Sequence, residues 1–444
     1  MSTPRIERSS GVPPIPPLVR AVARPLAAFF RLEAASGILL LAAAVAALAW
    51  ANLAGGSYHA FVEAPLGIRI GPLVAAFTVH ALVNDGLMTL FFFVVGMEIK
   101  HELAVGELRS PSRAALPLVA ALGGMLVPAA IYLAWNSGGE GQAGWGIPMA
   151  TDIAFAIGIL ALLRSRVPHA LLVFVTALAI FDDIGGILVI AFFYGEGVAM
   201  TWLAGAVALA AGLGVLSRWQ VRSGLAWACG GATLWYAFHR AGIHPTIAGV
   251  ALGLLVPARP RFHQQDVIDA LTLHAGALAG SREDEARAAE DVVGIEKALE
   301  ARESLVVRLT SILHPWVAFG VVPAFALVNS GVELAAIPPH RLLGSVAVGT
   351  AVALLAGKAL GIFAFTAAAV KLGLAPIPGE AGWMRLLGAC AVAGIGFTVA
   401  IFIAGLAFHD RPDLLDEAKL GILAGSLAAG VAGALVLRAT PPVR

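Results

Sequence analysis

Long hydrophobic stretches dominate this chain, and short polar stretches separate them. A helix that crosses a bilayer needs about 20 mostly apolar residues, and the longer stretches reach that length. Twelve such segments are predicted, at residues 34–53, 79–99, 114–135, 147–163, 170–194, 201–217, 224–238, 243–257, 312–330, 343–370, 386–408 and 418–437. The pattern therefore predicts an all-α integral membrane protein.

The composition agrees with this prediction. Hydrophobic residues make up 59% of the 444 residues and charged residues 13%, against about 25% charged residues in soluble domains, and the mean hydropathy is +0.86. The Lys and Arg residues lie in short separate clusters and the net charge is +1, so nucleic acid is not an expected partner. Both cysteines, Cys229 and Cys390, lie in apolar segments, which indicates neither a disulfide framework nor a thiolate metal site.

The basic residues predict an orientation, because Lys and Arg are enriched in cytoplasmic loops. With twelve spans and a cytoplasmic start, 23 of the 29 basic residues fall in cytoplasmic segments, and Lys358 alone lies in the interior of a span. Both termini are therefore predicted to be cytoplasmic. The predicted parts are a Pro-rich basic segment at 1–30, a membrane domain at 31–438 and a tail at 439–444.

Two connections differ from the other loops. Residues 61–75 contain short alternating runs with turn-forming Pro and Gly, which favour a small external β-hairpin. The long cytoplasmic loop at 259–309 places Val292, Ile295 and Leu299 on one helical face among charged residues, which favours a surface helix. That helix is either a solvated tether or a regulatory element.

Two adjacent aspartates interrupt the apolar run "LAIFDDIGGILVIAF". Each acidic side chain at the centre of a membrane helix costs about 2.5 to 3.5 kcal/mol by insertion scales, so Asp182 and Asp183 are expected to have a function. Neighbouring helical residues point about 100° apart. At most one of the two can therefore fully face a given cavity.

Two spans contain residues that disturb a helix. "GWGIPMA" precedes "TDIAFAIGILA" at Thr151, and "AVAGIGF" runs into "TVAIFIAGLAF" at Thr398. The two longer stretches share Thr, Phe and Gly at the first, fifth and eighth positions, which indicates an internal repeat. Interrupted helices in corresponding halves of a chain predict a transporter binding site.

Seven stretches then resemble the NhaA-type sodium/proton antiporters, in the order of that family: "FFFVVGMEIKHEL", "GWGIPMATDIAFAIGILALL", "ALAIFDDIGGILVIAFFY", "GIHPTIAGV", "HPWVAF", "GKALGIF" and "GIGFTVAIFIAGLAF". NhaA is itself among the proteins from which the rule on interrupted helices was drawn. The resemblance implies about twelve helices with inverted repeats, two of them discontinuous and crossing near the bilayer midplane.

The resemblance also implies a transporter rather than an enzyme. It would exchange Na⁺ or Li⁺ for H⁺ across a prokaryotic plasma membrane, in contact with membrane lipid, as a homodimer joined partly by the hairpin. No cofactor is expected. Two H⁺ for each Na⁺ would make the exchange electrogenic.

The resemblance assigns roles to the buried polar residues. Asp183 resembles the central cation-binding carboxylate, and Asp182 its neighbour that pairs with a lysine. Asp152 would compensate half-helix dipoles at the break and assist binding, unless it only caps a helix. Thr151 could offer an oxygen to the ion, or be an ordinary helical threonine. Lys358 is expected to pair with Asp182; the rival interpretation is that it offsets the half-helix dipole near residues 394–396.

Weaker candidates lie near the predicted cytoplasmic ends of helices. Glu98, Lys100, His101 and Glu102 in "GMEIKHEL", with His314 nearby, resemble a pH-sensing cation funnel, but an ordinary charged helix end is equally consistent. The chain also lacks the charged pair that the family often has shortly before "HPW". His244 matches a family histidine, for which a structural role is the simpler interpretation.

Two other functions place acidic residues in a membrane. An intramembrane aspartyl protease needs two aspartates that face each other from different helices. Adjacent Asp182 and Asp183 do not supply this arrangement, although Asp152 with one of them could. A passive cation channel needs neither a buried lysine nor titrating carboxylates.

Overall fold

The computed structural model describes residues 35–70, 73–195, 197–259, 264–280, 293, 295, 303–379 and 381–443. The predicted N-terminal segment at 1–30 lies outside the described residues. So does most of the predicted surface helix around Val292 and Leu299. Val293 and Ile295, the two described residues of that predicted helix, are helical. The long loop also contains a helix that was not predicted, α11 (Gln264–Gly280).

All twelve predicted apolar segments are helical in the structure. The α-helices that form them are α2 (Ala35–Val62), α3 (Val79–Ala81), α4 (Met88–Ala104), α5 (Pro111–Trp135), α6 (Ile153–Leu162), α7 (His169–Phe193), α8 (Met200–Arg218), α9 (Gly224–Ala241), α10 (Thr246–Leu255), α13 (Leu305–Trp316), α14 (Val322–Asn329), α16 (Ser345–Val352), α17 (Ala359–Lys371), α18 (Gly382–Val392), α19 (Phe397–Ala407) and α20 (Pro412–Arg438). The short α15 (Pro339–Leu342) precedes α16.

Short non-α segments complete several of these helices. The π-helical segments are η1 (Leu82–Leu87), η4 (Val317–Val321) and η6 (Ala353–Lys358), and the 3₁₀ segments are η2 (Glu107–Arg109), η3 (Glu140–Met149) and η5 (Leu334–Ala336). Because π-helical turns occur often at functional sites, η6 is notable for ending at Lys358.

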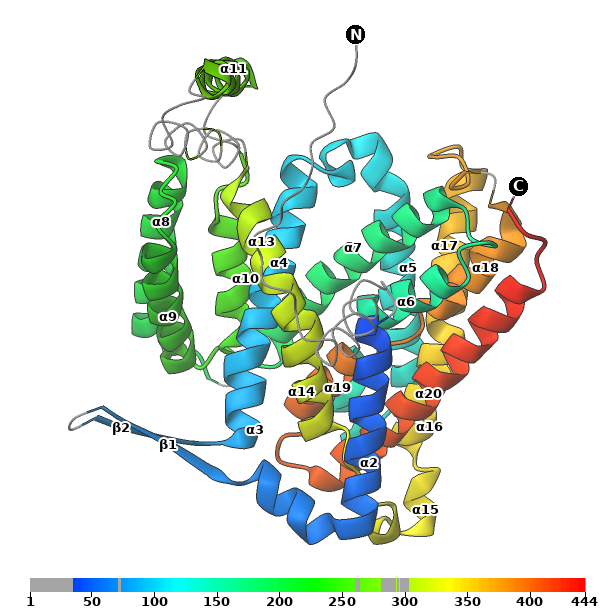
Figure 1. The fold of residues 1–444 in the computed structure, drawn as a ribbon. Coiled ribbons are helices and arrows are strands. Elements are labelled where there is room, and N and C mark those ends of the chain that lie inside the picture. The colour runs from blue at the N-terminus through cyan, green and yellow to red at the C-terminus, as the bar shows by residue number, and fades with distance from the viewer. Residues whose placement is uncertain are drawn as a thin grey trace, which may run out of the picture.

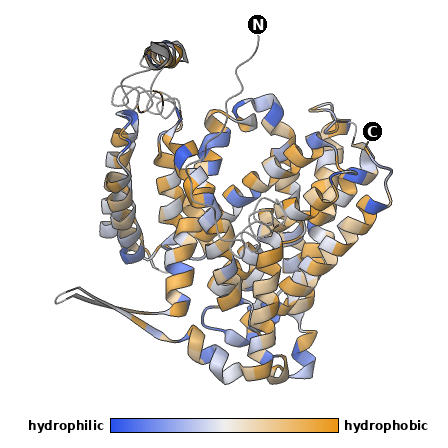
Figure 2. Cartoon of the chain, in the orientation of Figure 1, coloured by the Kyte–Doolittle hydropathy of each residue, from blue (hydrophilic) through white to orange (hydrophobic). Residues whose placement is uncertain are grey.

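The length and apolarity of these helices indicate which of them could cross a membrane. Among the described residues, eight helical stretches are long and apolar enough to cross it, and ten if each of two bent pairs counts as one crossing. The remaining two predicted spans correspond to α9, which falls outside that count, and to α10, which has only ten residues. Figure 2 shows hydrophobic residues along the length of the bundle, with hydrophilic ones gathered toward its ends.

The two interrupted helices are present where the sequence predicted them. η3 and α6 form one bent pair with an angle of 44°, and α18 and α19 form the other with an angle of 45°. Pro148 lies just before the first break, and Gly394 and Gly396 lie within the second. Proline removes a backbone donor and glycine lacks a Cβ atom, so both sequences favour an end to the helix at these points.

The predicted hairpin forms slightly later than expected. β1 (Pro65–Ile70) pairs antiparallel with β2 (Leu73–Thr78), with Pro65 opposite Thr78. It extends away from the helical bundle (Figure 1). α2, which precedes it, is broken at Ala54, where φ is −150°. The hairpin and α15 mark one end of the bundle, and the C terminus marks the other (Figure 1).

Candidate functional site

The two helix breaks contact each other in the interior of the bundle. The backbone N–H of Asp152 donates to the carbonyl of Ile395, with a distance of 2.6 Å between nitrogen and oxygen. The Thr151 hydroxyl lies 3.0 Å from the carbonyl oxygen of Ala393. Each break thus satisfies backbone groups that the other leaves without a helical partner, as buried irregular backbone in a membrane requires.

Asp152 joins the two breaks through its side chain. It is the N-cap of α6, where Oδ1 accepts the Phe155 N–H at 3.2 Å. Its Oδ2 accepts both the backbone N–H of Thr398, at 3.1 Å, and the Thr398 hydroxyl, at 2.6 Å. One carboxylate, 3% exposed, therefore lies at the positive N-terminal ends of both α6 and α19, where the helix dipoles favour a negative charge.

Asp182 and Lys358 form a buried ion pair beside the breaks. Lys358 Nζ lies 2.9 Å from Asp182 Oδ2, and neither side chain is exposed. The ammonium also donates to the carbonyl of Met149, the last residue of η3. Lys358 therefore has the aspartate partner expected from the sequence, and it contacts the carbonyl end of η3 rather than the break at 394–396.

Thr151 links this ion pair to the second break. Its hydroxyl lies 2.7 Å from Asp182 Oδ2 as well as 3.0 Å from the Ala393 carbonyl. A hydroxyl carries one proton, so it can donate to only one of these acceptors at a time. The other Asp182 oxygen, Oδ1, is buried without a hydrogen-bond partner in the part of the chain that the structure describes.

Asp183 differs from its neighbour in what it contacts. Within the described residues, no hydrogen bond or ion pair engages its carboxylate, and the residue is 8% exposed against 1% for Asp182. Charges on Asp182, Glu98, Asp152 and Lys358 all act on it. Asp183 is therefore a nearly buried carboxylate whose oxygens remain available to a ligand.

These oxygens suit a hard monovalent cation. Alkali and alkaline-earth ions prefer carboxylate, carbonyl and hydroxyl oxygens, and Asp183 together with Asp182 Oδ1 supplies acceptors that no group among the described residues uses. Among the described residues there is no cluster of three or more His, Cys, Asp or Glu side chains that could hold a metal ion.

Comparison with known proteins identifies the family. The family model described as Na+/H+ antiporter 1 matches residues 27–437. The Na(+)/H(+) antiporter NhaA of Anaeromyxobacter sp. (strain Fw109-5) is 61% identical over 431 residues, which cover 97% of this chain and 94% of that relative. The Na(+)/H(+) antiporter NhaA 1 of Myxococcus xanthus (strain DK1622) is 52% identical over 437 residues, covering 98% and 97% of the two chains.

The chain belongs to the NhaA family of Na+/H+ antiporters. The resemblance of the seven sequence stretches is thus confirmed. The chain is therefore a multi-pass membrane transporter. Its buried carboxylates are candidate parts of a transport pathway.

The weaker candidate site residues lie on different helices. Glu98 is half-buried on α4, and its charge reaches Asp183. Lys100, His101 and Glu102 follow in the last turns of the same helix, whereas His314 is exposed on α13, which packs against α4. A role of this group in pH sensing stays a prediction.

His244 lies between α9 and α10 and has partners there. Its Nδ1 lies 2.8 Å from the Thr246 hydroxyl, and its Nε2 lies 3.7 Å from the carboxylate of Asp85. The ring also makes an edge contact with Phe402 of α19. These contacts favour the structural interpretation of His244.

Two residues of this NhaA crossing were missed in the sequence. Thr398 binds Asp152 through both its amide and its hydroxyl; its position opposite Thr151 in the repeat was a signal that could have identified it. Ser426 of α20 lies with Oγ 3.3 Å from the amide nitrogens of both Gly396 and Phe397. A lone serine in an apolar helix carries no such signal.

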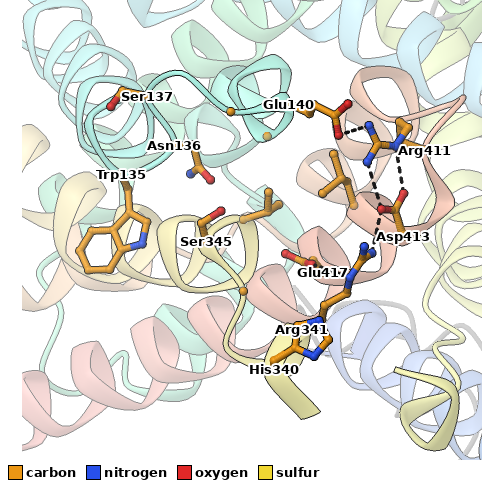
Figure 3. Close-up of a pocket in the computed structure, with 15 residues that line it drawn as sticks. Trp135, Asn136, Ser137, Glu140, His340, Arg341, Ser345, Arg411, Asp413 and Glu417 are labelled. Atoms are coloured by element: carbon orange, nitrogen blue, oxygen red, sulfur yellow. Dashed lines mark hydrogen bonds and ion pairs between the residues drawn. The ribbon is translucent and has the colours of Figure 1, made fainter. Parts of the chain in front are cut away.

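A separate polar cavity of about 390 Å³ lies at the hairpin end of the molecule, between the end of α5, η3, α15 and the start of α20. Figure 3 shows Arg411 beside Glu140 and Asp413, with Arg341 reaching Asp413 from α15. Hydrogen bonds with Asp413 and Glu140 raise the pKa of the Arg411 guanidinium, which stays charged. None of the four residues of the crossing, Thr151, Asp152, Asp182 and Asp183, lines this cavity.

Proposed function

We propose that this chain is a secondary transporter that exchanges Na⁺, or Li⁺, for H⁺, with Asp183 as the central ion-binding residue. The observation that carries the proposal is the contrast between the two adjacent carboxylates. Asp182 is held by Lys358 at 2.9 Å, whereas Asp183 has no hydrogen-bond partner among the described residues and is slightly exposed. Full-length relatives named Na(+)/H(+) antiporter support it.

Competition for the same oxygens gives the mechanism. A proton and a Na⁺ ion cannot both occupy the Asp183 carboxylate, so binding of one releases the other. Asp182 Oδ1, which has no hydrogen-bond partner among the described residues, is the second oxygen that the cation would use. When the site opens to one side Na⁺ displaces the proton, and when it opens to the other side a proton displaces Na⁺.

The proposed ratio is two protons for each Na⁺. The first proton would be carried by Asp183. The second would be carried either by Asp182 or by Lys358, whose ion pair at 2.9 Å is available to rearrange when a cation binds. Two positive charges exchanged for one make the cycle electrogenic, so the membrane potential contributes about 2.3 kcal/mol per charge for each 100 mV.

The exchange is tested in vesicles that contain the purified chain and a pH-sensitive dye. Addition of NaCl or LiCl should move protons, whereas choline chloride should not. Asp183→Asn should abolish the Na⁺-dependent signal without unfolding the protein. Asp410→Asn, which changes an acidic side chain that is 82% exposed, is the matched control and should keep it. Retained exchange in Asp183→Asn would exclude Asp183 as the site.

The ratio is tested with voltage. A K⁺ diffusion potential of the appropriate sign should accelerate exchange by the wild-type protein. Exchange that does not respond to voltage would contradict the two-for-one ratio but leave the site assignment intact. Cleavage of a helical peptide substrate, or cation conduction without proton movement, would instead favour the protease or the channel.

We also propose a membrane location, an orientation of the termini and an oligomeric state. The family match supports a prokaryotic inner membrane location. The basic-residue pattern supports cytoplasmic termini, and a reporter fused after Arg444 should be active only on the cytoplasmic side. The projecting hairpin (Figure 1) supports a homodimer. Deletion of residues 65–78 should then shift the purified protein toward monomer in light scattering.

A further inference from the structure

α20 contacts both interrupted helices, although it carries none of the proposed ion-binding residues. Its middle touches the second break, where Ser426 Oγ accepts hydrogen bonds from the N–H groups of Gly396 and Phe397, both at 3.3 Å. Its two ends touch the first interrupted helix. α20 therefore spans the bundle beside the two helices whose relative position defines the site.

The contact at the break replaces a missing helix cap. The first N–H groups of any helix lack a partner within it, and a Ser, Thr, Asp or Asn side chain at the N-cap commonly accepts from one of them. The N-cap of α19 is Gly396, which has no side chain to do so. Ser426, 6% exposed, supplies the acceptor from a different helix.

Ser426 and Asp152 accept hydrogen bonds from different backbone N–H groups at the start of α19. Ser426 takes the N–H groups of Gly396 and Phe397, and Asp152 takes that of Thr398. The start of α19 is thus held from α20 by one residue and from the first interrupted helix by the other.

The ends of α20 are fixed to the two halves of the first interrupted helix, near η3 at one end and just after α6 at the other. At the hairpin end, Arg411 forms an ion pair with Glu140, the first residue of η3 (Figure 3). At the C-terminal end, Arg166, just after α6, donates to the carbonyls of Arg438 and Thr440. The N–H of Val443 also donates to the Ser165 carbonyl at 2.7 Å.

We propose that α20 holds the two interrupted helices in position at their crossing and that Ser426 is a positioning residue for the ion site. The proposal rests on the proposed function, since it concerns the same site. Loss of the Ser426 hydroxyl leaves two buried N–H groups unpaired near Asp152. Their positive ends then face the crossing, which disfavours bound Na⁺ and bound protons alike.

The test compares Ser426→Ala, Ser426→Thr and Thr366→Ala in vesicles. Ser426→Ala should raise the KM for Na⁺ about tenfold, which corresponds to about 1.4 kcal/mol, and should shift the pH profile toward lower pH. Ser426→Thr keeps the hydroxyl and should restore both. Thr366→Ala removes a buried hydroxyl whose hydrogen bond, among the described residues, is to Ile362 of the same helix at 2.7 Å, and should change neither.

A second measurement does not depend on transport. Amide hydrogen exchange at residues 396–398 should become faster in Ser426→Ala but not in Thr366→Ala. Unchanged exchange there would overturn the positioning role even if the wild-type protein transports Na⁺. If the wild type moves no protons in response to Na⁺ but exchange still accelerates, the proposed function fails and the positioning contact stands.

Two further outcomes decide the proposal. A lower maximal rate or lower thermal stability in Ser426→Ala, with KM and pH profile unchanged, would show a merely structural residue. Should Ser426→Ala not fold, Ser426→Cys replaces it, because a thiol is a weak hydrogen-bond acceptor. An intermediate rise in KM is then expected, and an unchanged KM would overturn the proposal.

Discussion

Two ion pairs of similar length lie at different depths in this molecule. At the helix crossing, Lys358 Nζ and Asp182 Oδ2 are 2.9 Å apart and both side chains are fully buried. At the hairpin end, Arg341 Nη1 and Asp413 Oδ2 are 2.7 Å apart, but their side chains are 36% and 30% exposed. Distance alone would rank the second pair as the stronger.

The surroundings reverse that ranking. Water and salt screen an exposed pair, which typically contributes about 0 to 1 kcal/mol. Removal of one partner from a buried pair leaves a charge without compensation and costs about 3 to 5 kcal/mol. The exposed pair also has alternatives, since Asp413 binds Arg411 as well, whereas Asp182 has Lys358 as its only cation among the described residues.

The largest expected effect therefore belongs to Lys358. Lys358→Ala should lower the free energy of unfolding by about 3 to 5 kcal/mol, because it leaves the Asp182 carboxylate buried and unpaired. The double variant Lys358→Ala with Asp182→Asn should recover part of the loss, since the neutral amide needs no counter-charge. Thermal unfolding of the purified protein in one detergent measures both changes.

Additivity decides whether the two side chains interact as the distance suggests. Losses that simply add in the double variant would mean that they act independently and would contradict the pairing. Leu360→Ala is a suitable control, because it removes a side chain that is 55% exposed two residues away on the same helical segment.

The sequence was sufficient to predict the parts of the site that carry charge. Asp182, Asp183 and Lys358 are conspicuous because charge in an apolar helix is costly, and the breaks are marked by Pro148, Gly394 and their neighbours. The helices, the hairpin and both interruptions were predicted for the same reason: they depend on local pattern.

The partners of these residues could not be predicted in the same way. Asp152 binds the start of α19, and Ser426 replaces a cap that Gly396 lacks. Both contacts depend on which helices lie side by side. α20 also begins at Pro412, six residues before the predicted span, because Asp413, Asp416 and Glu417 are polar but helical. Hydropathy cannot distinguish a polar first turn from a loop.

An intermediate effect is expected at Asp152, which is buried like Asp182 but binds N–H and O–H groups instead of a cation. Asp152→Ala should destabilise the protein by about 1 to 3 kcal/mol, the cost of leaving a buried donor unpaired. Asp152→Asn keeps one acceptor oxygen and should lose less. Thermal unfolding ranks the variants between wild type and Lys358→Ala.

The order of these variants tests the comparison further. If Asp152→Ala lowers the free energy of unfolding as much as Lys358→Ala, burial alone sets the loss. The uncompensated charge of Asp182 then adds nothing. If Asp152→Asn and Asp152→Ala lose equally, the remaining oxygen does not cap α19, and the role assigned to the carboxylate at Thr398 is wrong.

The smallest effect is expected at the exposed pair, where a double-mutant cycle of Arg341→Ala and Asp413→Asn should give a coupling energy of at most about 1 kcal/mol. The cycle is needed because Asp413 also binds Arg411 and Arg341 lies 3.8 Å from Glu417, so either single change disturbs more than one contact. Near 1 M salt the screening length falls to about 3 Å, and the coupling should then vanish, whereas the coupling of Lys358 with Asp182 should persist because no ions enter a fully buried pair. A large coupling between Arg341 and Asp413 that does not respond to salt would mean that the cavity at the hairpin end is as isolated from solvent as the crossing. The exposure of the two side chains would then not determine the strength of their ion pair.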